Sequence, residues 1–222
     1  MWKFVTLSIA LLWAAVSVAA QELQQPDSKW IERLAPGFDT VAGNPVEYQK
    51  VLDKFSAALV RLSVRDCAIA YYGFPLQPGF DGSAPAGEED MQRAIMADDY
   101  ATAYALGTQI LARAPVNLTA LYWTLFAATE TDQPWEVRNS LRGRYNSIAH
   151  IIALSGDGTS TESALRVVWT GDMYTYTMLE LGLEIGDGFL WDSRWTELYI
   201  TPSETFPHTS IFFEPFPRAS NS

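Results

Sequence analysis

The sequence predicts an α+β fold that is mainly α: a stack of antiparallel helices with tetratricopeptide-like packing, followed by a small C-terminal antiparallel sheet. Two observations lead to this prediction. Between residues 44 and 182, apolar residues recur every three or four positions, which is the period of an amphipathic helix. After Gly182 apolar and polar residues alternate, as in half-buried strands. Helices and strands grouped in separate parts of a chain are typical of α+β domains.

The N-terminus has the pattern of a secretory signal peptide. Lys3 supplies a positive charge, residues 4–18 are apolar, and Ala19 and Ala20 form a small-residue cleavage site. This apolar run is shorter than the roughly 18 residues of a membrane span. We therefore expect residues 1–20 to be removed, leaving an exported, soluble protein that lies in the periplasm or outside the cell and has no membrane-inserted segment.

The composition argues against several classes of function. The chain carries 26 acidic and 15 basic residues, a formal net charge of −11, whereas nucleic acids and anionic membranes bind clustered positive charge. Cys67 is the only cysteine, so no internal disulfide can form, and its apolar neighbours favour a buried thiol over a nucleophile. No motif for a cofactor or a metal is present, and we predict neither.

Residues 21–43 are polar and interrupted by proline and glycine, with one apolar cluster at Trp30, Ile31 and Leu34, which predicts a flexible lead-in or a single short helix. A single helical domain with a terminal sheet then covers residues 44–214. Residues 215–222 are predicted to form a disordered tail.

Capping residues mark the expected helix starts. Asn44 precedes Pro45, a favoured first helical residue. The helix that starts at Ser63 should end at Gly73. Later starts are predicted at the acidic run Glu88 to Asp90, at Asp98 or Asp99, and at Asn117.

Two segments between the helices suggest how the helices are joined. Residues 99–121 place small residues and tyrosines on two helices linked by a turn with Pro115 and Asn117, as adjacent tetratricopeptide units are joined. Residues 73–87 are rich in glycine and proline but include Phe74 and other apolar residues. Such a loop either lines a groove or covers the core.

The turn at residues 155–158, Ser-Gly-Asp-Gly, follows the clearest amphipathic helix, expected over residues 135–154. Its apolar face is formed by Val137, Leu141, Tyr145, Ile148 and Ile152. Gly156 is expected to end this helix in the left-handed conformation, and Thr159 with Glu162 to begin a second helix that runs to Gly182. Strands are expected at residues 189–191, 195–201 and 210–214.

Candidate site residues fall into two groups. A hydrolase near the turn would use His150, Asp157 and Arg142, provided that they converge. A binding module would use the aromatic residues Tyr71, Tyr72 and Phe74, with Arg142 for charge. We favour a non-catalytic binding module for a protein, peptide or glycan, and keep the hydrolase as the alternative.

Several segments together resemble the exported bacterial family called domain of unknown function 4919. They are Tyr71 to Phe74, Ala114 to Leu121, the turn at Ser155 to Thr159, Leu181 with Gly182, and Ile211 to Phe213. The resemblance implies an exported helical domain with a small terminal sheet and no known activity. In that family, many members carry a His-Glu-Tyr or similar acidic-tyrosine motif on the helix after the turn, where this chain has Gly171 to Tyr176. The histidine is absent, so an acid–base role would pass only to Asp172 with Tyr174.

Overall fold

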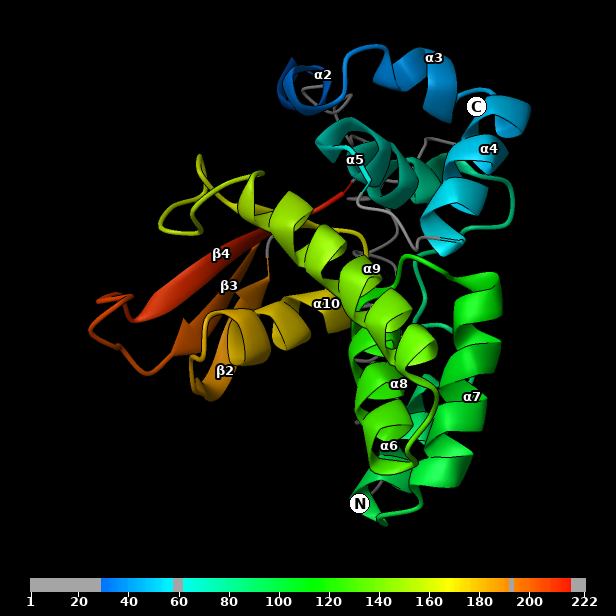
Figure 1. Cartoon of the computed structure of the whole chain (residues 1–222). Helices are drawn as coiled ribbons and strands as arrows, with labels where there is room; N and C mark the ends of the chain where they lie inside the picture. The colour runs from blue at the N-terminus through cyan, green and yellow to red at the C-terminus, as the bar shows by residue number, and fades with distance from the viewer. Residues whose placement is uncertain (1–28, 58–61, 192–193, 217–222) are drawn as a thin grey trace, which may run out of the picture.

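The computed structural model describes residues 29–57, 62–191 and 194–216. Within these residues the chain forms nine α-helices and a small four-stranded sheet near the C-terminus (Figure 1). The predicted signal peptide and residues 217–222 of the predicted tail lie outside the described residues. No helix in the described ranges is both long and apolar enough to cross a membrane.

The described part of the predicted lead-in is helical. Residues 29–43 form α2 (Lys29–Leu34) and α3 (Phe38–Ala42) in place of the expected flexible segment or single short helix. Trp30 and Phe38 are buried, and the Trp30 ring packs edge-on against Tyr72 with ring centroids 4.8 Å apart. Apolar side chains of this segment therefore supply part of the core.

The six longer helices agree with the predictions. They are α4 (Pro45–Ser56), α5 (Val64–Gly73), α6 (Glu88–Met96), α7 (Tyr100–Arg113), α8 (Leu118–Glu130) and α9 (Trp135–Ala153). Four of them begin at the predicted side-chain caps: Asn44, Ser63, Asp99 and Asn117 each accept a hydrogen bond from a first-turn amide. A 3-10 turn, η1 (Phe74–Leu76), extends α5.

Helix α9 crosses the centre of the molecule (Figure 1). The view shows α2 to α5 above it, α6 to α8 below it, and the sheet to one side. Consecutive helices from α6 to α9 pack against one another, and α9 also contacts α5 and β1 (Leu165–Val167). Its face at Leu141, Tyr145, Ile148 and Ile152 is buried as predicted.

The sheet is mixed and has one more strand than predicted. Its order is β1, β4 (Ser210–Pro215), β3 (Thr196–Ile200) and β2 (Ile185–Trp191). The last three strands pair antiparallel, as predicted, but β1 pairs parallel with β4. Because β4 ends at Pro215 and Phe216 is buried, the first two residues of the predicted tail belong to the folded domain.

The predicted helix from Thr159 to Gly182 is wrong. Residues 159–164 form a loop that leads into β1, and only then come α10 (Thr170–Thr175) and a π-helical turn, η2 (Tyr176–Glu180). The amide and hydroxyl of Thr159 both donate to Asp157 Oδ1, at 2.9 and 2.7 Å, so Thr159 closes a turn and does not cap a helix.

Glycine is required at two positions of the Ser155–Gly158 turn. The left-handed residue is Gly158, with φ 72°, and not Gly156 as predicted. A Cβ at Gly156 would lie 2.3 Å from the Ser163 carbonyl oxygen and 2.4 Å from that of Ala164. The backbone of the turn therefore packs directly on the chain entering β1.

We predict that Gly156→Ala lowers the free energy of unfolding by about 1–3 kcal/mol, because the added methyl group must displace backbone and not a flexible side chain. Gly143→Ala is the matched control. Gly143 lies within α9, and a Cβ there meets nothing within 4 Å. The control should gain about 0.5–1 kcal/mol from the higher helix propensity of alanine. Urea unfolding followed by circular dichroism measures both, and equal effects would contradict the proposed packing.

Candidate functional site

A cleft of about 990 Å³ lies between α4, α7 and α9. Each helix contributes one face to it. From α4 come Pro45, Tyr48, Gln49, Leu52, Asp53 and Ser56; from α7 come Tyr104, Thr108, Leu111, Ala112 and Arg113; and from α9 come Glu136, Val137, Ser140, Leu141 and Arg144. Phe74, Gln77, Pro78, Pro115 and Thr124 complete the lining. Its volume is at the upper end of the range for small-molecule sites, ~300–1,000 Å³.

The period of α9 explains why one stripe of the helix faces the cleft. Glu136, Ser140 and Arg144 are spaced four residues apart, so they lie on the same side of the helix. Val137 and Leu141 lie beside them and add apolar surface. The cleft is therefore walled by regular helices, which hold its side chains more rigidly than loops do.

Arg144 is the most unusual side chain of the cleft. It is 9% exposed, and one Nη atom donates to the Pro115 carbonyl oxygen at 2.7 Å. Its guanidinium lies over the Phe55 ring, 5.4 Å from the centroid, while its Nε has no hydrogen-bond partner. None of the ion pairs among the described residues includes Arg144.

The pKa of Arg144 falls to about 10 because burial disfavours the charged form. Arginine stays protonated at neutral pH even after such a shift. The cleft thus contains a buried cation that no carboxylate of the described residues neutralises.

A smaller cavity of about 260 Å³ adjoins the cleft. Phe74, Gln77, Pro78 and Arg113 line both cavities. Phe74 and Phe80 both pack on the buried Trp169, with ring centroids 5.3 and 5.7 Å away. The loop at residues 73–87 therefore does both things the sequence allowed, since it covers a core tryptophan and borders a cavity.

Asp172 lies at the centre of a buried hydrogen-bond network. Its Oδ2 accepts from the Tyr71 hydroxyl at 2.7 Å. Its Oδ1 accepts from the amides of Leu118 and Thr119, at 3.0 and 3.2 Å, and from the Thr119 hydroxyl at 3.4 Å. Because these amides begin α8, the carboxylate also lies at the positive end of a helix dipole. Tyr71 in turn accepts from the Val168 amide at 3.0 Å.

Burial raises the pKa of Asp172 to about 7, against the hydrogen bonds from Tyr71 and Thr119, which act in the opposite direction. Glu88 is a second buried carboxyl group, and burial raises its pKa too. Glu88 approaches the residue before Asp172, since a Cβ at Gly171 would be 3.1 Å from Glu88 Oε1. Asp172 itself is 0% exposed, so its carboxyl group does not face solvent.

The predicted aromatic ligand residues lie at different depths. Tyr71 and Tyr72 are 0% exposed and pack on each other with ring centroids 4.9 Å apart, so neither ring offers a free face for stacking. Phe74 is partly buried and borders the cleft. Arg142 lies on the exposed side of α9 and is not among the residues that line the cleft.

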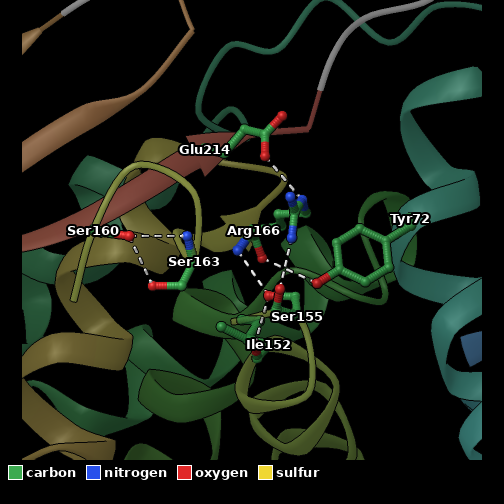
Figure 2. Close-up of polar contacts among 7 residues, drawn as sticks. All are labelled: Tyr72, Ile152, Ser155, Ser160, Ser163, Arg166 and Glu214. Carbon is green, nitrogen blue, oxygen red and sulfur yellow. Dashed lines mark hydrogen bonds and ion pairs between the residues drawn. The ribbon is translucent and has the colours of Figure 1, made fainter. Parts of the chain in front are cut away.

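Tyr72 takes part in a second polar cluster, at the end of α9 (Figure 2). Its hydroxyl donates to the Arg166 carbonyl oxygen at 3.0 Å. The Arg166 amide donates to Ser155 Oγ at 2.8 Å, and the Arg166 guanidinium donates to the Ser155 carbonyl oxygen at 2.6 Å and forms an ion pair with Glu214 at 2.9 Å. These contacts join α5, α9, β1 and β4.

The Ser155 hydroxyl donates to the Ile152 carbonyl oxygen at 2.6 Å, so its proton points at backbone and not at a base (Figure 2). Asp157 is exposed, and its Oδ1 accepts from Ser163 Oγ at 2.6 Å as well as from Thr159. These bonds, Ser163 first, lower the pKa of Asp157. His150 is exposed on α9, and no hydrogen bond or ion pair among the described residues joins it to Asp157.

Two further predictions concern single residues and metals. Cys67 is buried, as expected, and burial raises the pKa of its thiol. Among the residues that the structure describes, no group of three or more histidine, cysteine, aspartate or glutamate side chains is arranged to hold a metal ion.

Arg144 was not among the residues predicted from the sequence to form a site, although the sequence contains a signal for it. Arg144 follows Leu141 by three residues and precedes Ile148 by four, so it stands within the apolar stripe of α9. A charged residue in such a stripe is either paired inside the fold or directed into a cavity. The cleft itself depends on how α4 and α7 are placed, which the period of α9 does not reveal.

Residues 41–193 match the protein family described as Domain of unknown function (DUF4919). The chain belongs to this family. The matched segment contains every residue that lines the cleft, together with Asp172. Searches of curated proteins and of solved structures find no match.

The raised pKa of Asp172 predicts a stability that falls with pH. In the folded state the proton stays bound up to about pH 7, whereas the unfolded chain releases it near ~3.9. Between these values the folded state binds more protons, so the free energy of unfolding should fall as pH rises, by roughly 1–4 kcal/mol in all. Glu88 contributes in the same direction.

Asp172→Asn should flatten this dependence, because asparagine does not ionise yet keeps an oxygen for the α8 amides. The measurement is urea unfolding at several values between about pH 5 and about pH 8. Asp99→Asn is the control: Asp99 is an exposed cap with a lowered pKa, so it is ionised throughout this range and its variant should keep the slope of the unmodified protein. An unmodified protein that becomes more stable across the range would contradict the assignment.

Proposed function

We propose that this protein is a non-catalytic binding module whose ligand occupies the cleft between α4, α7 and α9. The observation that carries the proposal is the cleft itself, which has a volume of about 990 Å³ and mixes apolar side chains with a few charged ones. Binding sites for small ligands have this character. A protein, a peptide or a glycan is the class of partner we expect.

The polar clusters outside the cleft favour binding over catalysis. Asp172 and Ser155 are buried and hydrogen-bonded to neighbouring groups of the fold, and Asp157 accepts through Oδ1 from Thr159 and Ser163. A general base or nucleophile must instead reach the substrate. We therefore place the function in the cleft and assign structural roles to these three residues.

The setting of the module is part of the proposal. The sequence of residues 1–20 supports export, and the net charge of −11 supports partners other than nucleic acid. The successive contacts of α6, α7, α8 and α9 support tetratricopeptide-like packing, a type of helix stack that offers concave surfaces to ligands.

A tryptophan in the cleft should block binding. Thr108 is exposed on α7 and lines the cleft. The protein without its signal peptide would be incubated with a metabolite, glycan and peptide panel, and bound compounds identified by mass spectrometry after gel filtration. We expect Thr108→Trp to reduce retention of the bound compounds at least tenfold, because the indole ring fills the space.

Gln109→Trp is the matched control. Gln109 is the next residue of α7, is also exposed, and does not line the cleft. This variant should retain compounds as the unmodified protein does. If Thr108→Trp still binds the compounds, the ligand lies outside the cleft. The same holds if both variants remain folded and both lose binding.

A further inference from the structure

The charged side chains of the cleft indicate which class of ligand it binds. This inference rests on the proposed function, in which the cleft is the binding site. Arg144 is buried at 9% exposure and has an unpartnered Nε, and its one hydrogen bond goes to a neutral carbonyl group. Burying a charge without a counter-charge is costly, and buried cations are normally paired. A ligand with a carboxylate would supply the missing charge, and a hydrogen bond between the guanidinium and a carboxylate is stronger than one between neutral groups.

An acidic residue of the lining lies at the other end of the α9 stripe. Glu136 lies on the same stripe of α9 as Arg144, eight residues earlier in the chain. At 1.5 Å per residue, the two positions are about 12 Å apart along the helix axis. Over the whole lining, Asp53 and Glu136 balance Arg113 and Arg144. The lining is thus neutral in sum, and its stripe on α9 carries a negative charge at one end and a positive charge at the other.

A ligand that matches this pattern carries a carboxylate and a cation separated by a comparable length. An extended peptide spans ~3.3–3.6 Å per residue, so about three or four residues cover the distance from Glu136 to Arg144. We propose that the cleft binds a short peptide, with its C-terminal carboxylate paired with Arg144 and its N-terminal ammonium group directed toward Glu136.

The other lining residues suit a peptide better than a sugar chain. Leu52, Val137 and Leu141 offer apolar surface for side chains, and Ser140 offers a hydroxyl group for backbone amides. A neutral glycan supplies no charge for Arg144. An acidic glycan supplies the anion but leaves Glu136 without a cation.

The test uses pools of mixed-sequence tetrapeptides in four forms: with both termini free, with an amidated C-terminus, with an acetylated N-terminus, and with both ends blocked. Each pool is incubated with the protein lacking its signal peptide, and retained peptide is quantified by mass spectrometry. Losing one charge-assisted hydrogen-bond pair should weaken binding about 10- to 100-fold. We therefore expect amidation to have this effect, and acetylation a smaller one, because Glu136 is exposed.

Variants connect the effect to the residues. Arg144→Gln should bind the free pool as weakly as the unmodified protein binds the amidated pool, and amidation should then make no further difference. Glu136→Gln should remove the effect of acetylation in the same way. Arg93→Gln is the control: it removes a positive charge from the surface of α6, where Arg93 pairs with Asp90 outside the cleft.

The comparison of free and amidated peptides uses only the unmodified protein. It therefore tests the role of the C-terminal carboxylate even if Arg144→Gln fails to fold. Equal retention of free and amidated pools, or no retention of any pool, would overturn the inference. Should metabolites or glycans then bind and Thr108→Trp block them, the cleft would remain the binding site and only the peptide assignment would fall. If nothing in the wider panel binds the cleft, the proposed function falls as well.

Discussion

The structure depends on one buried carboxylate. Asp172 accepts hydrogen bonds from Tyr71 on α5 and from the first two amides of α8, and so joins two helices to α10, the helix that carries it. Without it, these amides and the Tyr71 hydroxyl would be buried without partners, each at a cost of about 1–3 kcal/mol. The same junction is held from its other side, because Arg144 donates to the Pro115 carbonyl oxygen just before α8 begins. The buried Asp172 carboxyl group and the buried Arg144 guanidinium thus both hold the turn between α7 and α8.

The Asp172 carboxyl group and the Arg144 guanidinium differ in how many hydrogen bonds they form within the fold. This difference suggests a structural role for Asp172 and a binding role for Arg144. Asp172 receives four hydrogen bonds and is closed off from solvent. Arg144 lines the cleft, and its guanidinium has one hydrogen bond, a ring beneath it and a buried Nε without a partner. Folded proteins satisfy nearly all buried polar groups, and those left unsatisfied often have a role beyond folding. In the proposed binding mode, the ligand therefore pairs with Arg144, whose charge the fold leaves incompletely paired, and not with Asp172.

Much of the fold could be predicted from the sequence, because its signals are local. The starts of four helices are predictable because each cap, at Asn44, Ser63, Asp99 or Asn117, bonds to an amide only two or three residues later in the chain. The segment after Ser155 is different. Thr159 and Glu162 fit a capping box in the sequence, but the Thr159 hydroxyl donates to Asp157. The chain then forms β1, which pairs with β4 some 48 residues later. Arg144 was missed for the same reason: its surroundings come from α4, α7 and the turn at Pro115, and the period of α9 shows only that it faces inward.

These contacts give the helices and the sheet different roles: the helices form the walls of the cleft, and the sheet supports α9. The family match at residues 41–193 includes all the helices that wall the cleft but ends before β3 and β4. Those two strands pack Leu198, Ile211 and Phe213 into the core and, through β1, support the end of α9. The ion pair of Arg166 with Glu214 and the Ser155 turn complete that support. Because α9 is held at its C-terminal end by the sheet and along its length by α5 and α8, its N-terminal half can present a fixed row of side chains, from Glu136 to Arg144, to whatever enters the cleft.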